Sequence, residues 1–374
     1  MDRQQTEQII KDLDKKIVFL VGPRQVGKTW LAKNIGQRYK KTVYLNYDRF
    51  EDRQIIEKEE WLKDTELLIL DELHKMKNWK NFLKGVYDTK AAGLRILVTG
   101  SARLDHFRQA GDSLAGRFFV HHLLPFSPAE IRQVGQEFDL DRFLARGGFP
   151  EPLLAAQTTE ADRWRSQYID SLIRTDVLDF ERIYDFRAIK DIFELLRRKV
   201  GSPISYRSLA ADAGVSPVTA RKYLAILESL YIVFRVTPYS KKIARSLLKE
   251  PKIYFYDNGL VVGDDGKKLE NLVAAALLKS VKGRNDYSGQ EEELKYLRTK
   301  EGKEVDFVLV NSQQEVSEII EVKAKESALS PNLRYFSDKY DWPAKQIVKE
   351  LKREREEGRI KVLKMQSYLE SLFL

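Results

Sequence analysis

A glycine-rich segment near the start of the chain has the residue types and spacing needed to hold the phosphates of a nucleotide. It follows the apolar run 16–21, fits the pattern GxxxxGK[ST] and is followed by a helical pattern. The glycines let backbone N–H groups point at phosphate oxygens, and the helix start adds the positive end of its dipole. In such loops the lysine reaches the β- and γ-phosphates, and the last hydroxyl binds Mg²⁺. We therefore expect ATP and Mg²⁺ to bind at Gly22, Pro23, Arg24, Gln25, Val26, Gly27, Lys28, Thr29 and Trp30.

Two acids at the end of a second apolar run supply the chemistry of hydrolysis. The run 67–70 predicts a central parallel strand buried on both faces, and Asp71 and Glu72 follow it directly. Asp71 is placed to hold Mg²⁺ through water, and Glu72 is placed to polarise the attacking water. Together with the glycine-rich loop, these acids predict ATP hydrolysis and not only ATP binding.

Small polar residues end another strand-like segment, 95–101, which resembles the sensor-1 strand of the AAA+ ATPases. The resemblance implies a polar side chain that contacts the γ-phosphate, and Thr99 and Ser101 both fit that role. Asn46 ends the strand-like run 42–46. It either pairs with the catalytic glutamate or is an ordinary residue at the end of a strand.

The resemblance to AAA+ proteins implies two further elements. The segment SLAGR ends at Arg117 before another apolar run, and an arginine at this place projects into the ATP site of a neighbouring subunit. Arg117 is therefore expected to act in trans in a homo-oligomer, with Arg103 as the second choice and a plain exposed arginine as the alternative. Gly148 and Pro150 resemble the lid element that packs near the nucleotide base, although the same residues are common in loops.

The positive charge of the chain is concentrated in one segment. The chain has a net charge of +9, and residues 187–249 contain 13 Lys or Arg against four Asp or Glu, which equals the whole excess. A dense basic segment indicates a polyanionic partner, most often nucleic acid. A solvated face without a partner is the alternative.

The same segment has the pattern of a helix-turn-helix followed by a wing. Residues 206–214 predict a short helix ending at glycine, Ser216 and Pro217 start a second helix, and strand-like runs follow at 231–236 and 252–256. The early turns of the second helix normally meet bases and phosphates. We therefore expect a winged helix that binds DNA, although such modules also serve packing or protein contacts. The expected DNA-binding residues are Thr219, Arg221, Lys222, Lys241, Lys242 and Arg245.

Acids and a lysine in the last third have the pattern of a nuclease site. Asp306 lies in the strand-like run 304–309, and Glu321 and Lys323 share one face of the run 319–323 because side chains alternate along a strand. Glu270 lies near the start of a preceding helical segment. This pattern resembles the restriction-endonuclease-like, PD-(D/E)xK, family, with Val305 where the usual proline stands. The resemblance implies that Glu270, Asp306 and Glu321 hold Mg²⁺ and that Lys323 is catalytic; an inactive site used for DNA or partner binding is the alternative.

The order of these parts resembles one archaeal and bacterial family of AAA+ ATPases with a winged helix and an uncharacterised restriction-endonuclease-like domain. The resemblance rests on GPRQVGKT, LLILDE, VTGSA, SLAGR, GGFPE, KLEN, EVDF and IEVK. It implies an α/β fold with a parallel-sheet P-loop core. The expected domains are the AAA+ core at 1–128, a helical lid or linker at 129–185, the winged helix at 186–250 and the endonuclease-like domain at 251–374.

The remaining composition excludes several classes of protein. The chain has no cysteine and four histidines, so we expect no disulfide and no zinc site. No apolar run is long enough for a membrane helix, and the polar start is not a signal peptide, so we expect a cytoplasmic protein. The predicted function is a DNA-dependent ATPase that remodels or translocates DNA and has the residues for cleaving it. A nucleotide-switched regulatory ATPase with an inactive nuclease-like domain is the alternative.

Overall fold

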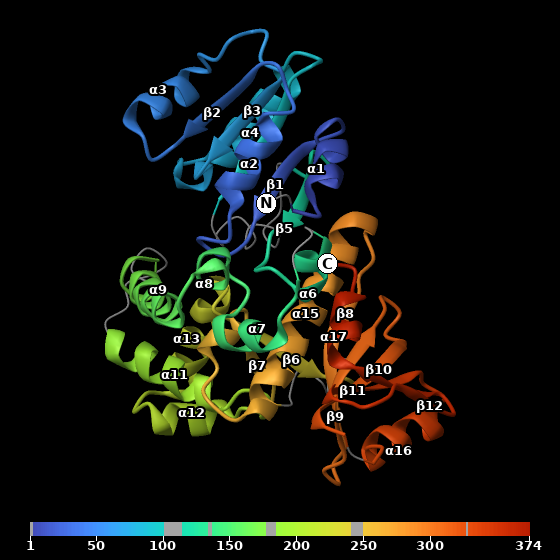
Figure 1. Cartoon of the computed structure of the whole chain (residues 1–374). Coiled ribbons are helices and arrows are strands. Elements are labelled where there is room, and N and C mark those ends of the chain that lie inside the picture. Colours follow the sequence, from blue (N-terminus) through green and yellow to red (C-terminus); the bar gives the residue numbers. More distant parts are fainter. Residues whose placement is uncertain (1–2, 101–113, 134–136, 177–184, 241–249, 327) are drawn as a thin grey trace. The chain divides into compact units, whose positions relative to one another are not determined.

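The computed structural model describes residues 3–100, 114–133, 137–176, 185–240, 250–326 and 328–374 (Figure 1). Ser101, Arg103, Lys241, Lys242 and Arg245 lie outside these ranges. The chain divides into two compact units, Met1–Leu124 and Pro125–Leu374. Within the described ranges, none of the helices combines the length and the apolar character that a membrane span requires.

Unit 1 contains a five-stranded sheet in which every neighbouring pair is parallel. All residues of β1 and β3 are buried, and so are all residues of β4 except Arg95 at its start, as expected for a sheet covered on both faces. The order across the sheet is β2-β3-β4-β1-β5. The strands are β1 (Ile17–Val21), β2 (Thr42–Asn46), β3 (Leu67–Asp71), β4 (Arg95–Thr99) and β5 (Phe118–His122).

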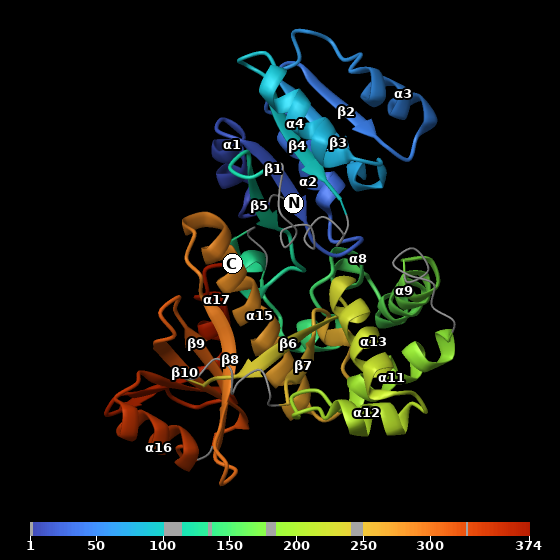
Figure 2. The same cartoon turned by 180° about the vertical axis from the view of Figure 1, so that it is seen from behind.

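Helices cover both faces of this sheet (Figure 1; Figure 2). Alternate strand residues such as Phe19 and Leu70 pack with Ile56 of one helix and Leu83 of another in one apolar core. Because parallel strands need crossover connections, β1, β2 and β3 are each followed by a helix that returns the chain to the same sheet edge. The helices are α1 (Thr6–Leu13), α2 (Lys28–Gly36), α3 (Phe50–Lys58), the 3₁₀ turn η1 (Leu73–Lys75) and α4 (Trp79–Thr89).

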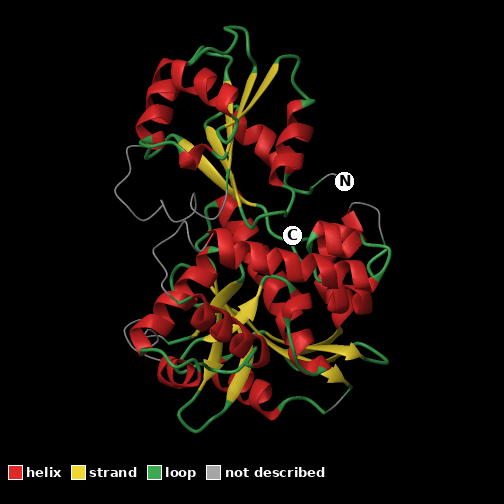
Figure 3. Cartoon of the chain, turned by 90° about the vertical axis from the view of Figure 1, so that its left-hand side faces the viewer, coloured by secondary structure: helices red, strands yellow, loops and turns green. Residues whose placement is uncertain are grey.

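Unit 2 contains helices and a mixed sheet (Figure 3), and most of its helices precede its strands in the chain. Gly214 has a positive φ of 67° and separates α12 from α13, as the sequence predicts. Ser216 accepts a hydrogen bond from the Thr219 N–H and caps α13. The first helices are α6 (Pro128–Gln133), α7 (Leu140–Arg146), α8 (Pro150–Leu154), α9 (Thr158–Ser171), the π turn η3 (Leu172–Asp176), α11 (Phe186–Arg198), α12 (Tyr206–Asp212) and α13 (Pro217–Ser229).

The mixed sheet has eight strands in the order β12-β13-β11-β10-β9-β8-β6-β7. Its strands are β6 (Val233–Pro238), β7 (Lys252–Phe255), β8 (Glu293–Arg298), β9 (Glu304–Val310), β10 (Val316–Lys325), β11 (Ala344–Glu350), β12 (Arg355–Glu357) and β13 (Ile360–Lys364). The accompanying helices are η4 (Asn258–Leu260), α15 (Asp265–Ser288), α16 (Pro331–Tyr340) and α17 (Met365–Glu370). Leu333 and Phe336 of α16 pack with Val308 and Val348 of the sheet.

The predicted boundary between residues 250 and 251 falls inside this sheet. Strand β6 lies before the boundary and β7 after it, yet they pair antiparallel, with Val233 opposite Phe255. Strand β6 also pairs with β8 through Thr237 and Lys295. The two strands that follow α13 therefore belong to the same sheet as the predicted nuclease residues.

Candidate functional site

The glycine-rich loop joins β1 to α2 in unit 1. Gly22 and Gly27 have φ values of 147° and 99°, which favour glycine. A Cβ on Gly22 would overlap the backbone carbonyl oxygen of Leu123. The Lys28 Nζ lies over the loop and donates to the carbonyl oxygens of Gly22, at 2.9 Å, and Pro23, at 2.6 Å. The loop thus places a buried ammonium group where the phosphates of a nucleotide are predicted to bind.

Asp71 lies at the end of β3 and accepts hydrogen bonds from hydroxyl groups of three different elements. Its Oδ2 accepts from Thr29 Oγ1 at 2.9 Å and from Tyr44 Oη at 2.7 Å, and its Oδ1 accepts from Thr99 Oγ1. The register explains this convergence, because Asp71 stands opposite Asn46 of β2 and Thr99 of β4. A carboxylate and a hydroxyl held this close fit the oxygen ligands that Mg²⁺ prefers, so Thr29 and Asp71 would hold the ion.

Glu72 follows Asp71 with a left-handed backbone, φ 57°, and its N–H donates to the Thr99 carbonyl at 3.0 Å. Burial raises the pKa of the Glu72 carboxyl above its ordinary value, against the lowering effect of Lys75. The Lys75 Nζ lies 3.8 Å from Glu72 Oε2, and His74 Nε2 lies 3.6 Å from the same oxygen. A carboxylate with a raised pKa accepts a proton more readily, which suits the predicted role of Glu72 in polarising water.

The structure describes only one of the two residues proposed as the sensor. Thr99 is fully buried and its hydroxyl is bound to Asp71, so the contact it makes here is with the carboxylate. Ser101 lies outside the described residues, and the choice between the two stays a prediction. Asn46 Oδ1 accepts from the Asp48 N–H at 2.9 Å, which is the turn expected of a strand-end asparagine.

Tyr44 was not singled out from the sequence. It lies two residues before Asn46 on β2, so both side chains share one face of the strand. Applying this period of two to Asn46 would have pointed to Tyr44. Burial and the hydrogen bond to Asp71 raise the pKa of the Tyr44 hydroxyl, which therefore stays protonated and donates.

Arg117 forms an ion pair inside its own unit. Its Nε donates to Asp88 Oδ1 at 2.9 Å and its Nη2 to Asp88 Oδ2 at 3.3 Å, and the side chain is 30% exposed. Asp88 lies near the end of α4. The predicted action of Arg117 on a neighbouring subunit would require this pair to open.

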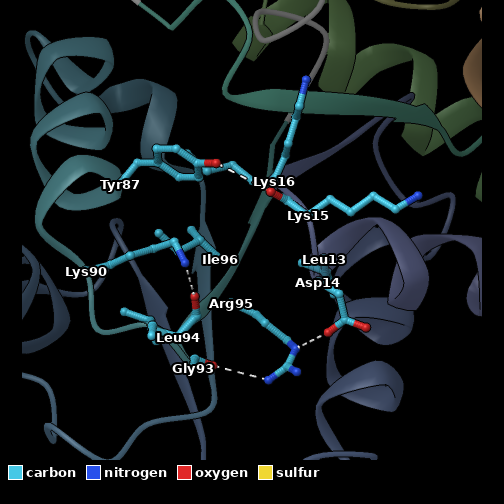
Figure 4. A pocket seen from close by; sticks show the side chains of 12 residues that line it. Leu13, Asp14, Lys15, Lys16, Tyr87, Lys90, Gly93, Leu94, Arg95 and Ile96 are labelled. Atoms are coloured by element: carbon cyan, nitrogen blue, oxygen red, sulfur yellow. Dashed lines mark hydrogen bonds and ion pairs between the residues drawn. The ribbon is translucent and has the colours of Figure 1, made fainter.

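A small pocket lies at the opposite edge of the sheet of unit 1, beside the starts of β1 and β4 (Figure 4). Three of its charged groups are bound within the chain: Arg95 Nε donates to Asp14 at 2.6 Å, and Lys90 Nζ donates to the Leu94 carbonyl at 2.8 Å. The nucleotide loop follows the end of β1, so this pocket is not part of that site.

The predicted lid residues lie in unit 2, where Gly148 is buried and Pro150 is half-buried. Gly148 accepts a hydrogen bond from the Phe126 N–H at 2.7 Å, and Pro150 opens α8. Between them, Phe149 is buried and packs against Trp164 and Tyr168. Their proximity to the nucleotide base stays a prediction.

The first turns of α13 present polar and basic side chains at the surface. Arg221 and Lys222 are exposed, and the Arg221 guanidinium lies 5.0 Å from the centre of the Tyr206 ring. Thr219 is half-buried, and Val218 beside it is 78% exposed. Exposed cations at the start of a helix are suited to contact with a polyanion.

The four predicted nuclease residues converge within unit 2. Glu321 Oε1 accepts from Lys323 Nζ at 2.8 Å. The Val322 N–H donates to Asp306 Oδ2 at 2.9 Å, which ties β9 to β10 at this point. Glu270 comes from α15, and its charge interacts with both Asp306 and Lys323.

Further polar residues complete the group, and the sequence patterns did not identify them. Lys252 Nζ lies 2.7 Å from Glu304 Oε1, 3.2 Å from Glu270 Oε1 and 3.8 Å from Asp306 Oδ1. Tyr254 Oη donates to Glu270 Oε1 at 2.6 Å. We call Lys252, Glu270, Glu304, Asp306, Glu321 and Lys323 the acid cluster.

Burial governs the ionisation of the acid cluster. It raises the pKa of Glu321 and of Glu270 to about 7, in each case with a further contribution from the charge of Asp306. Burial also raises the pKa of Asp306, against the lowering effect of Lys252. For Lys252, burial favours the neutral form, but the three neighbouring acids outweigh it and raise the pKa above its ordinary value.

The acid cluster does not fit a metal ion in this arrangement. Among the residues that the structure describes, no group of three or more Asp, Glu or His side chains could hold one. Glu270 and Asp306 already contact Lys252, and Glu321 already contacts Lys323. The assignment of Mg²⁺ to Glu270, Asp306 and Glu321 stays a prediction that would require these contacts to change.

Three family profiles match successive parts of the chain. Residues 14–132 match an AAA domain, residues 137–265 match a domain of unknown function (DUF8612), and residues 265–368 match a domain of unknown function (DUF4143). Residues 14–132 contain the loop, Asp71, Glu72 and Thr99. This part of the chain is therefore a P-loop ATPase domain of the AAA type.

The chain is also similar to uncharacterised proteins and to solved structures. An uncharacterised protein of Mycobacterium tuberculosis is 28% identical over 66% of this chain and 55% of its own length. The chain thus spans about half of that relative. An uncharacterised protein of Methanocaldococcus jannaschii is 25% identical over 86% of this chain and 80% of its own.

Two solved structures resemble the chain at low identity. A Walker-type ATPase of Pyrococcus abyssi is 15% identical, covers 69% of this chain and 94% of its own, and gives a TM-score of 0.45. RuvB of Thermotoga maritima, as its T158V variant, is 17% identical, covers 62% and 88%, and gives a TM-score of 0.33.

Proposed function

We propose that this chain is a Mg²⁺-dependent ATP hydrolase that acts on DNA. The observation that carries the ATPase part is the 2.9 Å contact between the Thr29 hydroxyl and Asp71, with Glu72 as the next residue. Lys28 binds the phosphates, Thr29 and Asp71 hold the ion, and Glu72 orients the attacking water. The bound Mg²⁺ would neutralise charge on the phosphates.

The DNA part of the proposal is supported by charge and by exposure. The basic segment 187–249 holds the whole charge excess of the chain, and Arg221 and Lys222 lie exposed on the early turns of α13. Helices α12 and α13 followed by the antiparallel strands β6 and β7 have the order of a winged helix. In our proposal the start of α13 binds duplex DNA.

The rate of ATP hydrolysis with and without duplex DNA tests the proposal. We expect DNA to stimulate the rate, and we expect Lys28→Ala to abolish hydrolysis while DNA still binds. The double variant Arg221→Ala/Lys222→Ala should weaken binding and lower the salt slope of the binding constant by about two. A matched double variant removes two exposed charges elsewhere in unit 2, Lys300→Ala/Arg353→Ala, and should leave both unchanged.

Two results would count against the DNA part. An ATPase rate that does not respond to DNA would favour the nucleotide-switched regulator instead. Equal losses of DNA binding in both double variants would show that net charge, and not α13, makes the contact.

A second part of the proposal is metal-assisted cleavage of the bound DNA, which would require the contacts of Lys252 and Lys323 with the acids to open. It is supported by the convergence of Glu270, Asp306, Glu321 and Lys323 from one helix and two strands. Linear and branched DNA should be incubated with Mg²⁺ or Mn²⁺ and the protein. Nicking that persists in Asp306→Asn would show that another site, or a contaminant, is responsible.

A further inference from the structure

Lys252 is a buried lysine that is not among the proposed ATPase or DNA-binding residues. It opens β7, and it is only 1% exposed. Its strand pairs with β6, which follows α13 in the chain. The backbone of Lys252 therefore belongs to the strand pair after the helix-turn-helix, whereas its side chain lies in the acid cluster.

The Lys252 ammonium lies between three carboxylates. Glu304 and Asp306 come from β9 and Glu270 comes from α15, at distances of 2.7, 3.8 and 3.2 Å from Nζ. Buried ions are stable only when they are paired in this way. Lys252 thus supplies the positive charge that these three acids need in the folded chain.

A divalent cation at this place would need the same oxygens. Mg²⁺ binds carboxylate oxygens at about 2.0–2.1 Å, and it would lie within a few ångströms of the ammonium group. Like charges at that separation repel strongly in a buried site. The ammonium and the metal ion therefore cannot both occupy the space between these carboxylates.

One carboxylate oxygen of the cluster has no hydrogen-bond partner among the described residues. Glu321 is 7% exposed, and its Oε2 is buried without a donor, while its Oε1 binds Lys323. An unpartnered buried oxygen raises the free energy of this arrangement.

We infer that Lys252 and a divalent cation compete for one position between Glu270, Glu304 and Asp306, so that the ion enters only when the ammonium leaves. The inference rests on the second part of the proposed function, since both concern the acid cluster. It goes further because it names the group that excludes the ion, and that group comes from the strand pair following the helix-turn-helix.

Binding of Mn²⁺ to the nucleotide-free full-length chain, measured by calorimetry, tests the competition. An Asp71→Asn background removes the ion site of unit 1. In that background Lys252→Met, which keeps the length but removes the charge, should bind Mn²⁺ at least about tenfold more tightly than the parent. Lys252→Arg keeps the charge and should bind no more tightly than the parent. Unchanged or weaker binding in Lys252→Met, or no binding in any of these proteins, would overturn the competition.

A second measurement does not depend on the folding of a Lys252 variant. An amine-reactive reagent followed by mass spectrometry reports how accessible Lys252 is in the parent protein, with exposed Lys300 as the internal reference. Saturating Mn²⁺ should increase the labelling of Lys252 relative to Lys300. Mn²⁺ binding that Asp306→Asn abolishes, without any change in Lys252 labelling, would overturn the inference. Neither measurement reads cleavage, so a protein that cuts no DNA would refute the second part of the proposed function and leave the competition standing.

Discussion

The substitution Thr99→Val removes one hydroxyl from the Asp71 carboxylate and nearly preserves the shape of the side chain. Thr99 is fully buried, and its Oγ1 donates to Asp71 Oδ1, whereas Thr29 and Tyr44 both bind Oδ2. The variant therefore removes the side-chain donor that holds one specific oxygen of a residue that is only 4% exposed.

The expected loss of stability follows from the charge of the acceptor. A hydrogen bond to a charged group contributes about 1.5–3 kcal/mol to the free energy of unfolding. Valine and threonine are similar in volume, so no cavity adds to this loss. For a unit of this size, the melting temperature should fall by roughly 5–12 °C.

Thermal unfolding and the Mg²⁺ dependence of ATP hydrolysis together check this expectation. The transition of unit 1 can be identified by its shift when a non-hydrolysable ATP analogue and Mg²⁺ are added. Thr99→Val should lower that transition and raise the Mg²⁺ concentration needed for half-maximal hydrolysis, because Asp71 is less well oriented. Thr99→Ser keeps the hydroxyl and should behave like the parent.

One result would refute the reasoning. If Thr99→Val melts like the parent but hydrolyses ATP slowly even at saturating Mg²⁺, the hydroxyl acts on the nucleotide and not on Asp71. Thr99 would then be the γ-phosphate sensor implied by the resemblance to AAA+ proteins.

Three further predictions concern other parts of the chain. If Arg117 acts on a neighbouring subunit, the ATPase rate per chain should rise with protein concentration. Arg117→Ala should remove that rise, whereas Asp88→Asn should not. A rate that does not depend on concentration, in a protein that sediments as a strict monomer, would contradict this. Gly22→Ala should destabilise unit 1 by roughly 2–4 kcal/mol because its Cβ would overlap a carbonyl oxygen, whereas Gly27→Ala, whose Cβ meets open space, should cost less in a denaturant titration. The pKa of Glu321 is raised to about 7, so the stability linked to its protonation is present below its ordinary pKa and is lost as pH rises through 7. From pH 5 to pH 8 the free energy of unfolding of the parent should therefore fall by up to about 3 kcal/mol relative to that of Glu321→Gln. The same pH dependence of the melting temperature in both proteins would exclude this.

The local elements of the ATPase could be predicted because neighbouring residues determine them. The loop between Gly22 and Thr29 requires glycine conformations and a helix start, and both are properties of a short segment. The sequence correctly predicted Asp71 at the end of a strand, because a short apolar run that ends in acids is compatible with few other structures. Ser216 and Pro217 likewise fixed the start of α13.

The predicted nuclease residues were brought together, but their surroundings were not foreseen. The period of two along β10 put Glu321 and Lys323 on one face, and their contact of 2.8 Å follows from that pattern. No local pattern indicated that Lys252 would lie between Glu270 and Asp306. Its strand was assigned to the last predicted domain only because it follows the boundary at residue 250, and no residue pattern linked it to these acids.

The sequence by itself determined the phosphate loop, the acids of β3, the helix-turn-helix pattern and the strand faces of the acid cluster, since each depends on residues close together in the chain. The tertiary structure alone decided that Tyr44 would bind Asp71 and that Lys252 would enter the acid cluster. The first contact depends on the parallel register of β2 with β3, and the second on the sheet that joins β6 and β7 to β8 and β9. Such contacts are fixed by how buried strands pair and pack, and a reading of neighbouring residues carries no information about that pairing.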